Sequence, residues 1–341
     1  MTKLLKCLLI ILAVGIVALT IYIFKYQSQP SIPKTPSPRP SPKATQIDEE
    51  MTFIFAGDAM FGRAVYAKYH NDLKVAFENL GEGFFKNKDI AILNLEGPIV
   101  ENEFMPDINP DNLIMKFPPQ TKDALNFLGI NTVSLANNHT DNQGQANLNF
   151  TREILNETKI TTVGDPQNAT YLVKTFNHDR KQISIIAVNI LANTPALADL
   201  IKEQKSNDAF IIIFPHWGAE YQTTHNASQE KLAHLWIDNG ADMVIGSHPH
   251  VIQDAELYQE KPIFYSLGNF LFDQTFSQNT QRGLILNAKI KAKKLTLELI
   301  PIISNMQPRL LDQEEKENII SSLKKNLQDE TGGDSIELNI E

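Results

Sequence analysis

Five short apolar runs in this sequence each end in a side chain that can bind a metal ion or move a proton. Near-continuous runs of Val, Ile and Leu are typical of buried parallel strands. Open α/β sheets gather their chemistry at the carboxyl ends of such strands. Five endings of this kind therefore predict one convergent polar site that holds metal. The runs are residues 52–57, before Asp58; 90–95, before Glu96; 131–136, before Asn137, Asn138 and His139; 210–215, before His216; and 242–247, before His248 and His250.

An uncharged apolar stretch over residues 7–24 is near the lower length limit for a membrane-spanning helix. Lys3 and Lys6 precede it, as the positive-inside rule requires of a cytoplasmic tail. The alternative is a cleaved signal peptide, but no small-residue cleavage site follows the stretch. We expect residues 1–26 to be the cytoplasmic tail and transmembrane anchor of a single-pass protein of the cell membrane, with the globular domain extracytoplasmic.

Residues 27–47 are predicted to be a linker, because six prolines stand there among Ser, Lys and Thr. This composition forms an extended polyproline spacer of up to about 60 Å, at about 3.1 Å per residue. The first 45 residues carry six Lys or Arg and no acid, whereas the rest of the chain carries 25 basic and 40 acidic residues. A net charge of −15 argues against nucleic acid or an anionic membrane surface as the main partner of the globular part.

Residues 48–310 are predicted to form one α/β domain, in which parallel units come first and antiparallel strands follow. A capping box at Asn226 and Gln229 starts one of the helices. The other predicted helices span residues 63–80, 118–128 and 145–156. After residue 255 the pattern changes to strands without helices, over residues 255–259, 262–268, 283–290 and 294–303. Residues 311–341 are expected to be a charged, peripheral C-terminal tail.

Two of the polar strand endings have spacings that point to specific chemistry. His139 stands beside the amide of Asn138, with Asp141 two residues on. A histidine next to a ligand, with a carboxylate to orient it, is the arrangement that a general acid needs near a metal. His248 and His250 flank a proline that fixes the backbone, so both imidazoles can address one site. This pair is the strongest single signal in the chain.

Six blocks of sequence, in order along residues 51–302, resemble the capsule-synthesis CapA family. That family is the poly-γ-glutamate biosynthesis branch of the calcineurin-like metallophosphoesterase fold. The resemblance implies a four-layer α-β-β-α sandwich of two mixed sheets with helices outside and the metal at the strand ends. The blocks are GDAMFGR (57–63), NLEGPIV (94–100), SLANNHTDNQG (134–144), HWGAEY (216–221), IGSHPHVIQ (245–253) and YSLGNFLF (265–272).

The resemblance also implies a ligand set for one or two divalent ions, Mn, Zn or Fe. Asp58 and His250 would serve the first ion, and Glu96 would bridge both. The second ion would be completed by Asn138, His216 and His248. The family's Asp-x-His motif reads Asp58-Ala59-Met60 here. A thioether is a poor ligand for a hard divalent ion, so the first position is short of one ligand.

Further roles follow from the same resemblance. His139 would be the general acid, held by Asp141. Roles either in supporting the metal ligands or in contacting substrate are implied for Arg63, Glu220, Tyr221 and Asn269.

Two functions are compatible with these residues. In the first, the domain is a metal-dependent hydrolase or transferase of metallophosphoesterase type, acting on an envelope polymer during capsule biosynthesis. In the second, it is a non-catalytic accessory or scaffold component of a polymer synthesis and export complex, whose subunits are its partners. The pairing of His139 with Asp141 favours the first function, and Met60 favours the second.

Overall fold

The structure is a computed structural model that describes residues 15–23, 25, 50–101, 109, 112–178, 181–329 and 333–340. The chain divides into two compact units, Met1–Ile47 and Asp48–Glu341. In the first unit, residues 15–23 and 25 are helical. Within the described ranges, no helix has both the length and the apolar character that crossing a membrane requires. The predicted anchor lies in large part, and the predicted Pro-rich linker entirely, outside the described residues.

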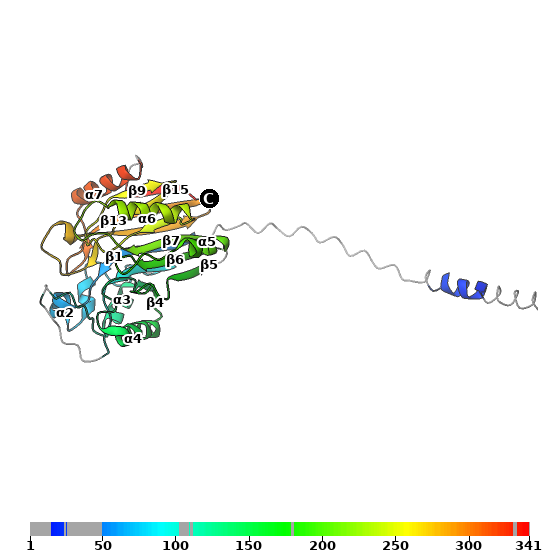
Figure 1. Ribbon diagram of the computed structural model, residues 1–341, viewed down its shortest axis with the longest axis horizontal. Coiled ribbons are helices and arrows are strands. Elements are labelled where there is room, and N and C mark those ends of the chain that lie inside the picture. The colour runs from blue at the N-terminus through cyan, green and yellow to red at the C-terminus, as the bar shows by residue number, and fades with distance from the viewer. Residues whose placement is uncertain are drawn as a thin grey trace, which may run out of the picture. The chain divides into compact units, whose positions relative to one another are not determined.

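The second unit confirms the predicted α/β fold with two mixed sheets (Figure 1). The larger sheet begins with the parallel strands β1 (Glu50–Ala59), β2 (Ile90–Leu95), β3 (Thr132–Ser134) and β4 (Thr161–Val163). Its later strands are β11 (Asn269–Leu271), β12 (Arg282–Lys291), β13 (Lys294–Ile303), β14 (Arg309–Leu310) and β15 (Ser335–Asn339). The strand order is β14-β13-β12-β1-β2-β3-β4, with β11 beside β1 and β15 beside β13.

The smaller sheet has the strand order β5-β6-β7-β8-β10-β9. Its strands are β5 (Val173–His178), β6 (Lys181–Asn189), β7 (Ala209–His216), β8 (Met243–Ile245), β9 (Ala255–Tyr258) and β10 (Lys261–Phe264). The four central strands run parallel and the two edge strands are antiparallel to their neighbours. The sequence did not single out β5 and β6.

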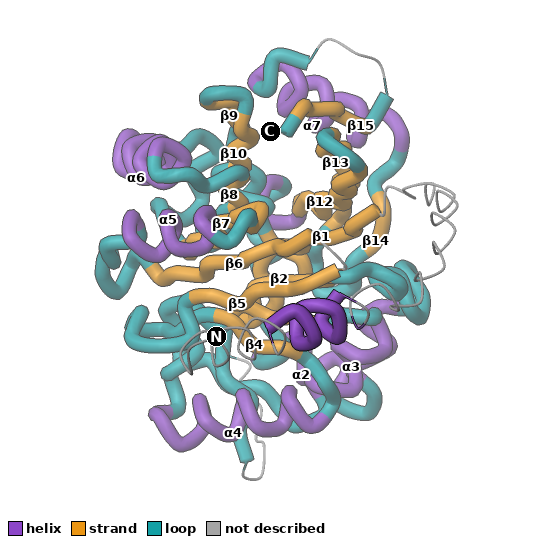
Figure 2. The backbone as a smooth tube through the Cα atoms, turned by 90° about the vertical axis from the view of Figure 1, so that its right-hand side faces the viewer, coloured by secondary structure: helices purple, strands orange, loops and turns teal. Residues whose placement is uncertain are grey.

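Helices cover the outer face of each sheet. Against the larger sheet pack α2 (Arg63–Tyr69), the 3₁₀ helix η1 (Leu73–Phe77), α3 (Thr121–Leu128) and α4 (Gly144–Glu157). Against the smaller sheet pack α5 (Ala198–Ser206) and α6 (Ala227–Asp238). Figure 2 shows these two groups of helices on different sides of the fold. A third apolar cluster, which includes Phe55, Phe214 and Leu284, joins the inner faces of the sheets, so the layers run helix, sheet, sheet, helix.

Most of the helix boundaries follow from local sequence signals. The capping box is present at Asn226 and Gln229, and Gly129 ends α3 with a φ of 87° that glycine adopts without strain. The expected helix over residues 63–80 is instead α2 and η1. Asp72 separates them, because its carboxylate accepts a hydrogen bond from the Lys74 backbone N–H and starts a new turn.

The C-terminal segment belongs to the fold, where the sequence predicted a peripheral tail. Strand β15 pairs with β13 over residues 335–339, and α7 (Gln313–Asn326) precedes it. Ile320, Leu323 and Ile336 join the apolar cluster between the sheets. Most charges of this segment therefore lie on the exposed side of α7, apart from the buried Lys324, while its apolar residues pack into the cluster between the sheets.

Candidate metal centre

The carboxyl ends of strands from both sheets meet at one edge of the sandwich. Asp58 lies in β1, Glu96 follows β2, and the loop after β3 carries Asn138 and His139. From the smaller sheet, His216 ends β7 and the loop after β8 carries His248 and His250. The structure therefore brings the side chains at all five predicted strand ends into one buried site.

Asp58 is fixed from three directions. Its Oδ1 accepts a hydrogen bond from Asn94 Nδ2 (2.8 Å), and its Oδ2 accepts one from the His248 backbone N–H (3.1 Å). The same Oδ2 lies 3.4 Å from His250 Nδ1. Burial alone would lower the pKa of His250, but the charges of Glu96 and Asp58 outweigh it and raise that pKa to about 9.

Glu96 is a fully buried carboxylate whose two oxygens accept no hydrogen bond from any described residue. Its Oε1 lies 3.5 Å from His250 Nε2 and 3.9 Å from His139 Nε2. Burial raises the pKa of Glu96 well above its usual range, although His250 opposes this. A buried polar group without a partner costs about 1–3 kcal/mol or more, so Glu96 needs a positive ligand to be stable in its charged form.

His216 and His248 are buried imidazoles with ring centres 4.7 Å apart. His216 Nε2 is 2.8 Å from Asn138 Oδ1, and its Nδ1 is 3.2 Å from Ser247 Oγ. His248 Nδ1 is buried and has no hydrogen-bond partner among the described residues. Burial lowers the pKa of both rings, that of His248 to about 4. They are therefore neutral at physiological pH, which is the form that binds metal.

These donors fit a divalent cation. Asp58, Glu96 and His216 each offer a ligand atom, and the three atoms lie within 4.8 Å of one another. Glu220, His248 and His250 form a second such group. The oxygens of Glu96 and the Nδ1 of His248 form no hydrogen bond to a described residue, and a cation would satisfy them. A set of oxygen and nitrogen donors without thiolate suits Mn, Zn or Fe.

Sequence comparison decides the family. The profile of the family described as "Bacterial capsule synthesis protein PGA_cap" matches residues 52–274. The chain belongs to this family. It is 27% identical to "Capsule biosynthesis protein CapA" of Bacillus anthracis over 271 residues, which is 72% of this chain and 65% of that protein, so it spans just under two thirds of that relative. It is 24% identical to "PGA biosynthesis protein CapA" of Bacillus subtilis (strain 168) over 295 residues, 81% of this chain and 75% of that protein.

Three other proteins are similar over a smaller share of the chain or at lower identity. A "Probable polyglutamine synthesis accessory protein" of Mycobacterium tuberculosis is 26% identical over 214 residues, 54% of this chain and 56% of that protein. Among solved structures, a hypothetical protein from Thermus thermophilus has a TM-score of 0.43 at 16% identity, over 76% of this chain and 96% of that chain. A phosphatase from Mycoplasma pneumoniae has a TM-score of 0.42 at 13% identity, over 80% and 98%.

The turn after β3 orients His139, and it corrects one prediction about this PGA_cap family member. His139 Nδ1 is 3.0 Å from Asn142 Oδ1, which also accepts a hydrogen bond from the Met115 backbone N–H (2.7 Å). Asp141, expected to hold the ring, instead accepts a hydrogen bond from Gln167 Nε2 (2.7 Å). The chain reverses here through a bond from Asn142 N–H to His139 O (3.0 Å), so the third residue after His139 returns to the ring. A neutral amide therefore orients this imidazole.

Two of the four residues implied beside the ligands or the substrate, Arg63 and Asn269, bind other side chains of the protein. Arg63 forms a buried ion pair with Asp273, and its guanidinium lies 5.6 Å from the centre of the Phe272 ring. The charge of Asp273 thus balances that of Arg63. Asn269 Oδ1 is 3.0 Å from His250 Nδ1, so this amide holds a candidate ligand in place.

The other two expected substrate contacts are exposed at the mouth of the site. Glu220 is exposed, and its carboxylate is within reach of His248 and His250. Tyr221 is held by a hydrogen bond from its backbone N–H to Pro249 O (2.8 Å), and its ring stacks at 6.2 Å from that of His250. Both residues can therefore meet a molecule that approaches the centre.

A buried pair of amides, Asn94 and Asn137, links the strand ends, and of the two only Asn137 was expected at the site. Asn94 Nδ2 serves Asp58, while Asn94 Oδ1 accepts a hydrogen bond from Asn137 Nδ2 (3.0 Å). Asn137 Oδ1 accepts bonds from the His139 backbone N–H (3.1 Å) and from Thr140 Oγ1 (2.7 Å). Asn94 was detectable as the one polar residue inside the apolar run 90–95. An amide suits this position because it donates and accepts at once.

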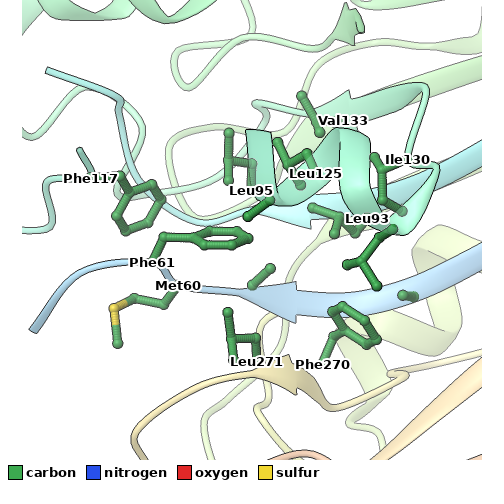
Figure 3. Packing of buried hydrophobic residues seen from close by; sticks show 14 of the residues in the cluster. Met60, Phe61, Leu93, Leu95, Phe117, Leu125, Ile130, Val133, Phe270 and Leu271 are labelled. Carbon is green, nitrogen blue, oxygen red and sulfur yellow. The ribbon is translucent and has the colours of Figure 1, made fainter. Parts of the chain in front are cut away.

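Met60 packs in the apolar core. It is buried in the outer cluster of the larger sheet with Phe61 and Phe117, as Figure 3 shows. Its Sδ accepts a hydrogen bond from the Gly62 backbone N–H at 3.0 Å. Met60 therefore stabilises the turn after β1, and an ion at the first position would have to draw its protein donors from the other residues of the centre.

Proposed function

We propose that this chain acts outside the cytoplasmic membrane in the synthesis of a capsule polymer of poly-γ-glutamate type, and that its centre is a metal-dependent hydrolase or transferase site. One observation supports the proposal most. The Glu96 oxygens and His248 Nδ1, which form no hydrogen bond to a described residue, lie among four further metal-binding donors from both sheets. Membership of the PGA_cap family and the names of the Bacillus relatives support the polymer. The six ordered sequence blocks support a calcineurin-like metallophosphoesterase type for the four layers.

In the proposed function, the residues of the centre are the ligands of one or two divalent ions. Asp58, Glu96 and His250 would hold one divalent ion, and Asn138, His216, His248 and Glu96 would hold a second. Such an ion would polarise a substrate oxygen and ease the deprotonation of water.

His139 would supply the proton to the leaving group from Nε2 when its ring is protonated, while Asn142 Oδ1 accepts a hydrogen bond from Nδ1 and holds the ring in place. The envelope polymer is the substrate, and subunits of a synthesis and export complex are the partners.

A second candidate function is a non-catalytic accessory role in the same process. Met60 favours it, because a core methionine at this position leaves the first ion with fewer ligands. The Mycobacterium tuberculosis relative is named an accessory protein. In this role the metal would hold the loops of the site in one conformation while the domain guides the polymer.

The metal content of three histidine variants tests whether the proposed centre binds metal. His248→Ala and His216→Ala chains are expected to lose most of their bound divalent metal, because each removes a neutral imidazole from the donor set. Elemental analysis of the purified proteins measures this. His234→Ala is the matched control: His234 is also an imidazole with a carboxylate partner, Glu256 at 2.9 Å, but it lies on α6. Equal metal in all three variants would contradict the proposed centre.

Membrane topology tests the location. Because Lys3 and Lys6 precede the apolar stretch, the positive-inside rule puts everything after about residue 27 outside the cytoplasm. A protease added to intact spheroplasts is expected to remove the globular domain, while a cytoplasmic marker protein is cleaved only after lysis. Full protection of the domain in intact spheroplasts is the result that would contradict this placement.

A further inference from the structure

An open groove of about 590 Å³ lies between α7 and the loops of the smaller sheet. Thr223 and Thr224 line it from the loop after β7, Gln253 and Asp254 from the loop after β8, and Asn279 from the 3₁₀ helix η2 (Asn279–Gln281). The remaining wall is α7, which contributes Asn318 and Ser322. None of the described residues that line this groove belongs to the proposed metal centre. Its α7 wall also lies beyond residues 52–274, the part that matches the family.

Five neutral side chains that can hydrogen-bond to a ligand line the groove, beside the apolar side chains of Ile252, Ile319 and Leu323. The hydroxyls of Thr223, Thr224 and Ser322 and the amides of Asn279 and Asn318 form no hydrogen bond to any described residue. Hydroxyl and amide side chains both donate and accept hydrogen bonds. They therefore match a ligand whose own groups do both, as the hydroxyls of a sugar do.

The charged groups of the groove are already paired. Arg282 binds Glu315 through two hydrogen bonds, Nε to Oε1 at 2.6 Å and Nη2 to Oε2 at 2.8 Å. Asp254 accepts hydrogen bonds from the His225 backbone N–H (2.9 Å), and both its oxygens lie about 3 Å from His225 Nδ1. Among the described lining residues, Arg282 is the only Lys or Arg, and Glu315 neutralises it. The groove is thus poorly suited to a polyanion, which needs unpaired positive charge.

Two exposed aromatic rings lie close in the sequence to residues that line the groove, and one of them, Tyr221, also stacks against His250 of the proposed metal centre. Tyr221 precedes Thr223 by two residues, and Phe276 precedes Gln278, a further lining residue, by two. Their rings pack edge to face with centres 5.1 Å apart, and 66% of Phe276 and 41% of Tyr221 remain exposed. Tyr221 Oη also accepts a hydrogen bond from Gln274 Nε2 (3.2 Å). An exposed aromatic ring near a polar groove offers an apolar surface, and the C–H face of a sugar ring can stack on such a surface.

We propose that this groove binds a neutral carbohydrate chain, with Tyr221 and Phe276 as its stacking platform and the threonine, serine and asparagine side chains as its hydroxyl partners. The chain runs from the α7 wall towards the mouth of the metal centre. The protein thereby holds a glycan of the envelope beside the site that acts on the polymer. The proposal does not depend on bound metal or on catalysis, because none of its binding groups is a proposed metal ligand, although Tyr221 also lies at the mouth of the centre.

Calorimetric titration of the purified full chain with chitotetraose and cellotetraose tests the proposal, in buffer free of detergents with sugar head groups. We expect saturable binding of at least one of them. Phe276→Ala is expected to weaken it about tenfold through loss of stacking. Asn318→Ala on the α7 wall is expected to weaken it about fivefold through loss of hydrogen bonds. Leu235→Ala removes an apolar side chain of comparable exposure (49%) from α6 and serves as the unaffected control.

Two further titrations separate this proposal from the others. A His248→Ala chain is expected to lose metal and keep its carbohydrate affinity, so failure of the metal centre and failure of the groove are distinguishable. An octamer of γ-linked glutamate is expected not to compete with the oligosaccharide. Absence of carbohydrate binding, affinity that Phe276→Ala and Asn318→Ala leave unchanged, or displacement by the glutamate octamer would each overturn the assignment.

Discussion

A His139→Gln chain is expected to keep its fold and its metal and to lose about 10²- to 10⁴-fold of its activity, the usual contribution of an acid–base group. His139 Nε2 lies 3.9 Å from Glu96 Oε1 at the centre, whereas its Nδ1 faces away to Asn142 at 3.0 Å. Glutamine preserves a hydrogen-bonding side chain but cannot transfer a proton near neutral pH. Capsule polymer output of cells that carry the variant, together with the metal content of the purified protein, measures the outcome.

Two neighbouring substitutions serve as controls, because the structure separates their roles. Asn142→Ala removes the acceptor of the His139 ring and is expected to reduce output by less than His139→Gln does. Asp141→Asn is expected to leave output unchanged, since Asp141 is bonded to Gln167 and points away from the ring. If His139→Gln cells made normal polymer while deletion of the domain abolished it, the accessory role would be the correct one.

The ends of the buried strands were predictable because a buried strand has an apolar sequence. A strand buried on both faces is apolar along nearly its whole length, and the run 90–95, in which Asn94 is the one polar residue, coincides with β2 (Ile90–Leu95). The first polar residue after such a run has to lie at the edge of the sheet. The sequence could thus locate Glu96, His216 and His248 near one another without any knowledge of how the two sheets pack.

Contacts that depend on turns and on strand pairing were not predictable in this way. Whether Asp141 or Asn142 meets His139 depends on one reverse turn, and both residues are polar acceptors. Asn269 holds His250 only because β11 pairs with β1, so that Asn269 lies opposite Asp58.

The sequence of the C-terminal segment contains an amphipathic helix pattern that its high charge content made hard to see. Ile320, Leu323 and Leu327 recur at helical spacing within a highly charged stretch, and all three are buried. Charge content suggested a peripheral tail, whereas the spacing of these few apolar residues decides where α7 packs.

A Gly57→Ala chain is expected to be destabilised on the order of 4 kcal/mol or more, or to fail to fold, which is the upper range for single substitutions. A Cβ atom at this position would lie 1.8 Å from Gly268 O and 2.9 Å from Gly268 C. That oxygen accepts the hydrogen bond from the Asp58 backbone N–H at 3.0 Å. The clash is with backbone, which cannot rotate away as a side chain can, so β1 and the residues leading into β11 would have to separate.

Gly81→Ala is the matched control for this effect. Gly81 also has a special conformation, with a φ of 86°, but a Cβ there would meet nothing within 4 Å. Its cost is therefore the left-handed backbone alone, about 1–2 kcal/mol. Urea denaturation of both variants measures the difference, and equal losses would show that the close approach at Gly57 is relieved cheaply. A larger loss at Gly57 would show that the approach of Gly57 to Gly268 holds Asp58 and Asn269 in register at the metal centre.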